Sequence, residues 1–226
     1  MNGVVPDKTY VALWWDYDEN GTNKKKLDEA AGFHNQANYE TYGRKKNNGS
    51  KGVNGRQREY LSFAYGYRTG EAIFNALMQA YHISTKPIHL VNIFGHGVPA
   101  GLTSGYHEGI RGLYSYSRLT DSDGVVRDVD EAHGGRIITN LPTDIFADDV
   151  VIVIHNCSTS QHFAVEFLKH LVSNGKVKAK IFAHRNLTGT SFNMQWFEHT
   201  KDNPDGVKIA PLNRQYWLYP DSPRRA

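Results

Sequence analysis

The chain has 226 residues, of which 39% are hydrophobic and 22% are charged, and its formal net charge is +3 at pH 7. This length and composition predict one folded domain over residues 1–226 rather than a disordered chain. The small net charge gives no indication of nucleic acid as the main partner. No apolar run approaches the roughly 20 residues of a membrane-spanning helix, and the amino terminus lacks a signal-type pattern. We therefore expect no membrane span, and a location in the cytoplasm or export by a leaderless route.

The first third of the chain predicts two strands and two helices. Residues 10–15 (YVALWW) form a strand-like apolar run that ends in the turn-rich sequence DYDENGTN. Residues 24–42 predict a helix, and the Gly/Asn/Lys-rich segment 43–55 predicts a loop before a second strand over 60–65. Thr69 is placed to cap a second helix. The apolar residues of that helix follow helical spacing: Ile73, Phe74, Leu77, Met78 and Tyr81.

A third strand over 89–94 is followed by a long interval rich in glycine and serine, from residue 98 to residue 135. Short strands within this interval are predicted at 113–118 and 125–129. An ordered connection of this length often binds a substrate or regulates a site.

The remaining segments predict a strand over 150–154, a helix over 158–171 that ends at Gly175, and a strand over 179–183. Ser158, Thr159 and Ser160 are capping candidates, which would bring the amino end of the helix close to Cys157. The alternation of strands and helices predicts a three-layer α/β/α sandwich with a mostly parallel sheet.

Two fragments carry the functional information. IHLVNIFGHG contains Gly95, His96 and Gly97, and DDVVIVIHNC ends in Cys157, the only cysteine of the chain. Each run is apolar without alternation, as in strands that are buried on both faces, and open α/β sheets place their sites at the carboxyl ends of such strands. A lone thiol forms no internal disulfide and is compatible with a reducing compartment. A thiol and an imidazole in these positions indicate a cysteine nucleophile with an acid/base partner, although either residue alone is more often structural.

The order of these motifs resembles the caspase-like (clan CD) cysteine peptidases. This group includes caspases, metacaspases, legumains, gingipains, clostripain and the self-cleaving domains of RTX-type bacterial toxins. The matching pieces are VNIFGHG and VVIVIHNCSTS, and the order of elements agrees over residues 8–185. The local sequence IHNCS differs from the caspase pattern QACRG. The resemblance implies a caspase-like fold and an endopeptidase that needs no cofactor and takes a protein or peptide as its substrate.

The resemblance also implies roles for individual residues. Cys157 would attack the scissile carbonyl, and His96 would protonate the leaving amine and then help to activate water. The backbone N–H groups of Gly97 and Cys157 would stabilise the oxyanion. The exposed segments 43–55 and 103–135 are candidates for self-cleavage.

Substrate preference has several candidate determinants. His155 is two residues before Cys157 and would line the pocket for the residue that precedes the cut. Asp16 and Asp18 follow the first strand and could receive a Lys or Arg side chain, or they could simply form the turn. His184 and Arg185 follow the last predicted strand and could instead shape a pocket for an acidic group.

Three other functions are compatible with parts of the pattern. His96, His155, Cys157 and His162 could form a metal site, but they lack the spacing of common zinc motifs. A catalytically inactive caspase-fold binding module would keep the fold and carry a blocked thiol. Papain-like and amidase-like hydrolases place cysteine before histidine, which is the reverse of the order here, and the G-x-S-x-G motif of α/β-hydrolases is absent from the GHGVP segment.

Overall fold

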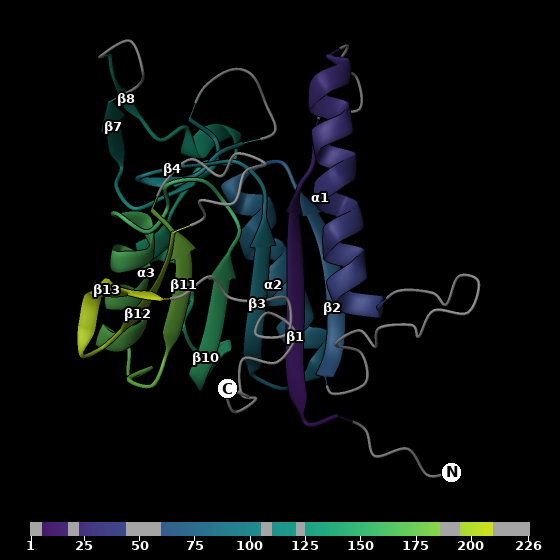
Figure 1. Cartoon of the computed structure of the whole chain (residues 1–226), viewed down its shortest axis with the longest axis vertical. Coiled ribbons are helices and arrows are strands. Elements are labelled where there is room, and N and C mark those ends of the chain that lie inside the picture. Colours follow the sequence, from purple (N-terminus) through teal and green to yellow (C-terminus); the bar gives the residue numbers. More distant parts are fainter. Residues whose placement is uncertain are drawn as a thin grey trace.

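A computed structural model describes residues 6–17, 23–43, 60–104, 110–120, 125–185 and 195–209. Its main feature is a seven-stranded mixed sheet. The strands are β1 (Lys8–Trp15), β2 (Tyr60–Tyr67), β3 (Ile88–Phe94), β10 (Phe146–Ile154), β11 (Lys180–His184), β12 (Trp196–Thr200) and β13 (Asn203–Ile209). They lie in the order β13-β12-β11-β10-β3-β1-β2, and the five strands from β11 to β2 are parallel (Figure 1). The predicted α/β fold with a mostly parallel sheet is confirmed at this level.

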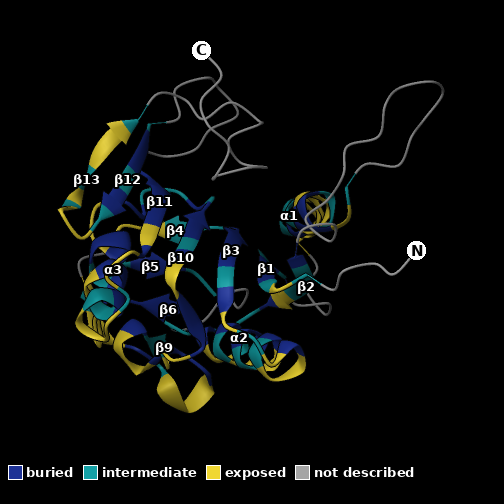
Figure 2. Cartoon of the chain, turned by 90° about the horizontal axis from the view of Figure 1, so that it is seen from below, coloured by how far each residue is buried: buried dark blue, intermediate teal, exposed yellow. Residues whose placement is uncertain are grey.

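Helices flank both faces of the sheet. They are α1 (Lys24–Tyr42), α2 (Gly70–Ser84) and α3 (Phe163–Ser173). Figure 2 shows α1 on one face and both α2 and α3 on the other. The predicted cap of α2 is confirmed, because the Thr69 hydroxyl accepts a hydrogen bond of 3.1 Å from the N–H of Ala72. The side chain of Asn23 caps α1 in the same way.

The apolar strands are buried on both faces, as their sequences predict. Val91 and Ile93 of β3 belong to the core cluster that α2 and α3 cover, and Leu90 and Phe94 belong to the cluster on the α1 face. The alternation along the strand follows from its two-residue period. Asn92 is the polar exception: it is buried, and its amide donates to the hydroxyl of Tyr10.

The described part of the connection between β3 and β10 contains a second, smaller sheet and no α-helix. Its four strands are β4 (Gly97–Val98), β5 (Gly101–Leu102), β6 (Leu113–Tyr114) and β9 (Arg136–Ile137), and a separate hairpin consists of β7 (Arg118–Thr120) and β8 (Val126–Asp128). The 3-10 helices η2 (Glu131–His133) and η3 (Ile138–Asn140) complete this connection. It lies near the carboxyl ends of the parallel strands (Figure 1).

Two parts of the structure differ from the sequence-based expectation. The helix predicted from residue 158 begins at Phe163, and residues 157–162 form turns. The antiparallel pair β12–β13 was not predicted and extends the sheet beyond β11. Among the helices that the structure describes, none is both long and apolar enough to cross a membrane.

Candidate functional site

The carboxyl ends of β3 and β10 meet because the two strands are parallel neighbours. Ile93 pairs with Ile154, and the N–H of His155 donates to the carbonyl of Ile93 at 2.8 Å. The loops that carry His96 and Cys157 therefore start at the same level of the sheet. The chain passes from β1 to α1 on one face of the sheet. The helix that connects β2 to β3, α2, lies on the opposite face. The site thus lies beside the point where the winding direction changes, where open α/β sheets bind their ligands.

The two loops pack directly against each other. The side-chain amide of Asn156 donates to the carbonyl of His96 at 2.8 Å. A β-carbon on Gly97 would lie within 2.7–2.8 Å of the Thr159 methyl group, the Asn156 β-carbon and the Cys157 carbonyl oxygen. Only glycine fits this approach without a shift of the turn. The sequence analysis did not identify Asn156 as a site residue. Its position next to Cys157 in the chain was the only feature that could have indicated it.

Cys157 lies in a turn, and the residue as a whole is half-buried. The next residue, Ser158, has a φ of 56°, in the left-handed region that non-glycine residues rarely adopt. Thr159 stabilises the turn through a hydrogen bond from its hydroxyl to the carbonyl of Asn156. Ser160 continues the turn, with its hydroxyl 2.9 Å from His199 Nε2.

The expected helix start beside Cys157 is wrong. α3 begins at Phe163, and its N-cap residue His162 makes no side-chain capping hydrogen bond. Ser158, Thr159 and Ser160 lie in the preceding turns rather than at the cap. The first turn of this helix therefore does not lie beside Cys157, and the N–H groups nearest to Cys157 belong to the two loops.

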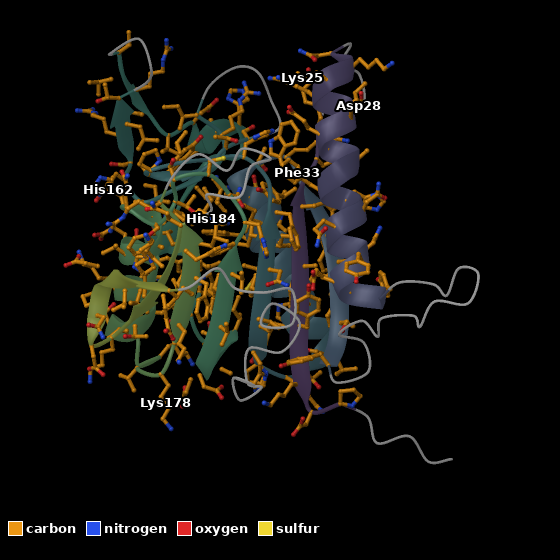
Figure 3. All side chains as sticks on the ribbon, viewed as in Figure 1. Lys25, Asp28, Phe33, His162, Lys178 and His184 are labelled. Atoms are coloured by element: carbon orange, nitrogen blue, oxygen red, sulfur yellow. The ribbon has the colours of Figure 1, made fainter. Side chains whose placement is uncertain are left out.

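Residues at the end of β1 and on α1 contact the ring of His96. Its Nε2 lies 3.1 Å from Glu29 Oε2. Trp15 and Phe33 meet the ring edge to face, with centroids 4.8 Å and 5.3 Å away. Figure 3 shows Phe33 on α1, with Lys25 and Asp28 nearer the start of the helix. The contacts of Glu29 and Phe33 with His96 were not found from the sequence, because 60 or more residues separate the partners.

His155 lies among aromatic rings. It stacks on Phe94 with centroids 4.3 Å apart and meets the edge of Trp196 at 5.7 Å. Burial, and secondarily the nearby charge of His184, lowers the pKa of His155 to about 3. This side chain is therefore neutral at physiological pH. Its contacts place it beside the end of β10, on the sheet face that carries Phe94.

The candidate basic residues at the end of β11, His184 and Arg185, pack against aromatic rings. Burial lowers the pKa of His184 to about 3, and the centroid of its ring lies 3.4 Å from that of Trp196. The guanidinium of Arg185 lies 4.0 Å above the ring of Phe197. A neutral His184 offers no positive charge to an acidic substrate group. The expectation that His184 helps to shape a pocket for an acidic group therefore has no electrostatic basis.

Asp16 already has a cationic partner. Its Oδ2 lies 3.0 Å from Nη2 and 3.1 Å from Nε of Arg68 at the end of β2. The carbonyl of Arg68 accepts from the hydroxyl of Ser104, which connects this pair to the start of the insert. A substrate cation would have to compete with Arg68 for the Asp16 carboxylate. Asp18 lies outside the described residues.

The residues considered for a metal site have separate surroundings. His96 packs with Trp15 and Phe33, whereas His155 packs with Phe94 and Trp196. Within the described ranges, no group of three or more His, Cys, Asp or Glu side chains is arranged to hold a metal ion.

No family model, curated protein or solved structure matches the chain. The functional argument therefore depends on the geometry of the two loops. The two loops carry a half-buried cysteine, a histidine whose ring has a carboxylate partner, and a glycine that is closely packed against the cysteine loop. These are the components of nucleophilic acyl transfer by a cysteine.

Proposed function

We propose that the chain is a caspase-like cysteine endopeptidase, with Cys157 as the nucleophile and His96 as the general acid/base. The observation that carries the proposal is the packing of Gly97 against the turn of Cys157 and Asn156, at the joint carboxyl end of β3 and β10. This contact holds the histidine loop and the cysteine loop side by side at the carboxyl end of the two central strands β3 and β10. It agrees with the arrangement that the sequence resemblance implies.

The reaction would proceed through a thioester. His96 takes the proton of the Cys157 thiol, and the thiolate attacks the scissile carbonyl carbon. The carbonyl oxygen becomes an oxyanion that the N–H groups of Gly97 and Cys157 stabilise. The C–N bond breaks as His96 donates a proton to the leaving amine. His96 then takes a proton from water, whose oxygen attacks the thioester carbon. The C–S bond breaks, the carboxylic acid leaves, and His96 returns its proton to the sulfur as the thiol is restored.

Replacement of the two proposed catalytic side chains tests the function. A positional peptide library is incubated with the wild type, Cys157→Ala and His96→Ala. We expect Cys157→Ala to cleave nothing and His96→Ala to lose about 10²- to 10⁴-fold in turnover, the usual contribution of general acid/base catalysis. Circular dichroism checks that both variants keep their fold.

The matched control is His162→Ala. His162 is an exposed histidine in the turns that follow Cys157 (Figure 3). It should retain the turnover of the wild type. Iodoacetamide gives a second reading, because alkylation of Cys157 should slow in His96→Ala and not in the control. An uncleaved library together with alkylation that is independent of His96 would favour the inactive binding module instead.

Self-cleavage is part of the same proposal. The candidate segments are 43–55 and 103–135, and most of the first lies outside the described residues. Intact masses of the wild type and of Cys157→Ala after prolonged incubation should then differ. Identical masses would reject self-cleavage, and the proposed function would then be the cleavage of other substrates alone.

A further inference from the structure

Three side chains surround the ring of His96, and we call them the histidine clamp: Trp15, Glu29 and Phe33. Glu29 and Phe33 are four residues apart on α1, so they project from the same face of the helix. Their contacts with His96 differ in kind, because Glu29 meets a ring nitrogen and the two aromatic rings meet the imidazole edge to face. The clamp therefore limits both the position and the rotation of the ring.

The Glu29 contact also determines where the proton lies on a neutral ring. A carboxylate only accepts hydrogen bonds, so Nε2 at 3.1 Å from Glu29 Oε2 must carry the hydrogen. Nδ1 is then the nitrogen with the lone pair. Among the described residues Nδ1 has no hydrogen-bond partner, and 42% of the His96 side chain is exposed. The nitrogen that can exchange a proton with a substrate is thus the one turned away from Glu29.

The second oxygen of Glu29 has a weaker contact. Lys25 Nζ lies 4.0 Å from Glu29 Oε1, and its side chain is 86% exposed. Such a pair contributes little free energy, and it does not compete for Oε2. Glu29 keeps one oxygen for His96 while the other faces the start of the helix.

We infer that Glu29 is a positioning residue: it holds His96 with one proton on Nε2 and presents Nδ1 as the atom that takes the Cys157 thiol proton and then donates it to the leaving amine. The catalytic part of this inference rests on the proposed peptidase function. The resemblance implies only a His/Cys dyad, so the carboxylate is an addition specific to the contacts of this chain. α1 then has a functional role as well as covering one face of the sheet.

Nuclear magnetic resonance tests the proton position without requiring any activity. The protein is labelled with ¹⁵N-histidine, and the ring signals of His96 are identified by their loss in His96→Ala. At a pH where the ring is neutral, we expect a protonated Nε2 and a bare Nδ1, which ¹⁵N shifts distinguish. A bare Nε2 would overturn the inference, because no hydrogen bond to Glu29 could then exist.

Kinetics with Glu29→Gln, Glu29→Ala and Asp28→Asn test the positioning role. Glu29→Ala removes the acceptor and should lower kcat about 10-fold or more while KM changes less than about twofold, as expected for support of a catalytic group. Glu29→Gln keeps an acceptor oxygen and should recover part of that loss. Asp28→Asn makes the same charge change on an exposed neighbour of the same helix and should match the wild type.

The outcomes separate the two proposals. If the wild type cleaves peptides and Glu29→Ala equals Asp28→Asn in kcat, the positioning role is wrong and the peptidase function stands. If the wild type cleaves nothing, the peptidase function and the catalytic part of the inference fall together. The ring spectrum then still decides whether Glu29 holds the Nε2 proton.

Discussion

Gly97 has no space for a side chain. Three atoms of the cysteine loop would lie within 2.7–2.8 Å of a β-carbon there, and one of them is the backbone oxygen of Cys157. An added methyl group must therefore move the turn or the histidine loop. Because the two loops carry the proposed catalytic groups, the geometry of the site depends on this residue.

We expect Gly97→Ala to destabilise the fold by about 1–3 kcal/mol, as overpacking does, and to lower cleavage of a library substrate strongly. Chemical denaturation measures the first effect. Gly32→Ala on α1 is the control, since nothing lies within 4 Å of a β-carbon there. It should leave activity unchanged and raise stability slightly, because alanine favours a helix over glycine. A Gly97→Ala protein with both properties of the wild type would contradict the proposed packing.

Ser158 has an unusual backbone conformation beside the proposed nucleophile. Only two non-glycine residues in the described ranges have a positive φ: Thr85, at 54°, and Ser158, at 56°. Thr85 follows the last turn of α2, where left-handed residues commonly end a helix. Ser158 lies beside the proposed nucleophile, in a turn that no helix end explains. Strained residues often occur at functional sites because the surrounding structure holds a reactive group in position.

Replacement of Ser158 by Gly should relieve this strain. We expect the melting temperature to rise by about 2–4 °C, which corresponds to roughly 1 kcal/mol for a chain of this size. Turnover should fall, because Cys157 would then be held less firmly. Ser158→Ala keeps the β-carbon and should not be more stable than the wild type. An unchanged or lower melting temperature in Ser158→Gly would show that no strain is stored at this residue.

At the scale of single elements, the local sequence predicts the bounds of α1 but not its contacts with other elements. The bounds expected for this helix, residues 24–42, are those observed. Local signals suffice for the bounds, since Asn23 caps the first turn and Gly43 follows the last. The contacts of Glu29 and Phe33 with His96 depend on how the helix docks on the sheet. No pattern within one segment contains that information.

The start of α3 shows how tertiary contacts override local preference. Ser158, Thr159 and Ser160 have the side chains of helix caps. In the fold, however, the N–H of Ser160 donates to the carbonyl of His184, and the N–H of Phe163 donates to the carbonyl of Pro99. These long-range bonds keep the residues after Cys157 in turns and delay the helix. Apolar spacing still predicted the body of α3 correctly, because it reflects burial.

The pair β12–β13 was not predicted because its sequence lacks a long apolar run. β13 is an edge strand in which exposed and half-buried residues alternate, so it carries polar side chains such as Asn203 and Lys208. The candidate site was predictable where a reactive residue follows a buried strand, as His96 and Cys157 do. Asn156 and Glu29 belong to types that are common on any surface, so only the folded arrangement distinguishes them.

At the scale of the whole molecule, three buried or partly buried histidines lie on or beside the strands where the parallel sheet becomes antiparallel. They are His155 after β10, His184 at the end of β11 and His199 on β12. His199 contacts both the carbonyl of Pro204 and the hydroxyl of Ser160 in the cysteine loop. A carbonyl oxygen only accepts hydrogen bonds, so Nδ1 of His199 donates to Pro204. On the neutral ring, Nε2 then accepts from the hydroxyl of Ser160. Burial lowers the pKa of all three from the ordinary value of 6.5.

These histidines make the stability of the fold depend on pH in a definite direction. The pKa of His155 and of His184 is about 3 in the folded chain and about 6.5 in the unfolded chain. Above pH 6.5 both states are neutral, and the fold has its full stability. Below it the unfolded chain binds protons that the fold excludes, so the free energy of unfolding decreases as the pH falls toward 3. We expect the melting temperature to fall by about 5 °C or more between about pH 7 and pH 4.

The variant His184→Phe tests this cause, because it keeps an aromatic ring against Trp196 and removes one titrating group. Its melting temperature should depend less on pH than that of the wild type. His82→Gln removes an exposed histidine of α2 and should leave the dependence unchanged. The variant can also lose stability at pH 7 through imperfect packing, so the comparison is made on the slope with pH and not on the absolute value. Equal slopes in His184→Phe and His82→Gln would show that acid destabilises the fold through other groups.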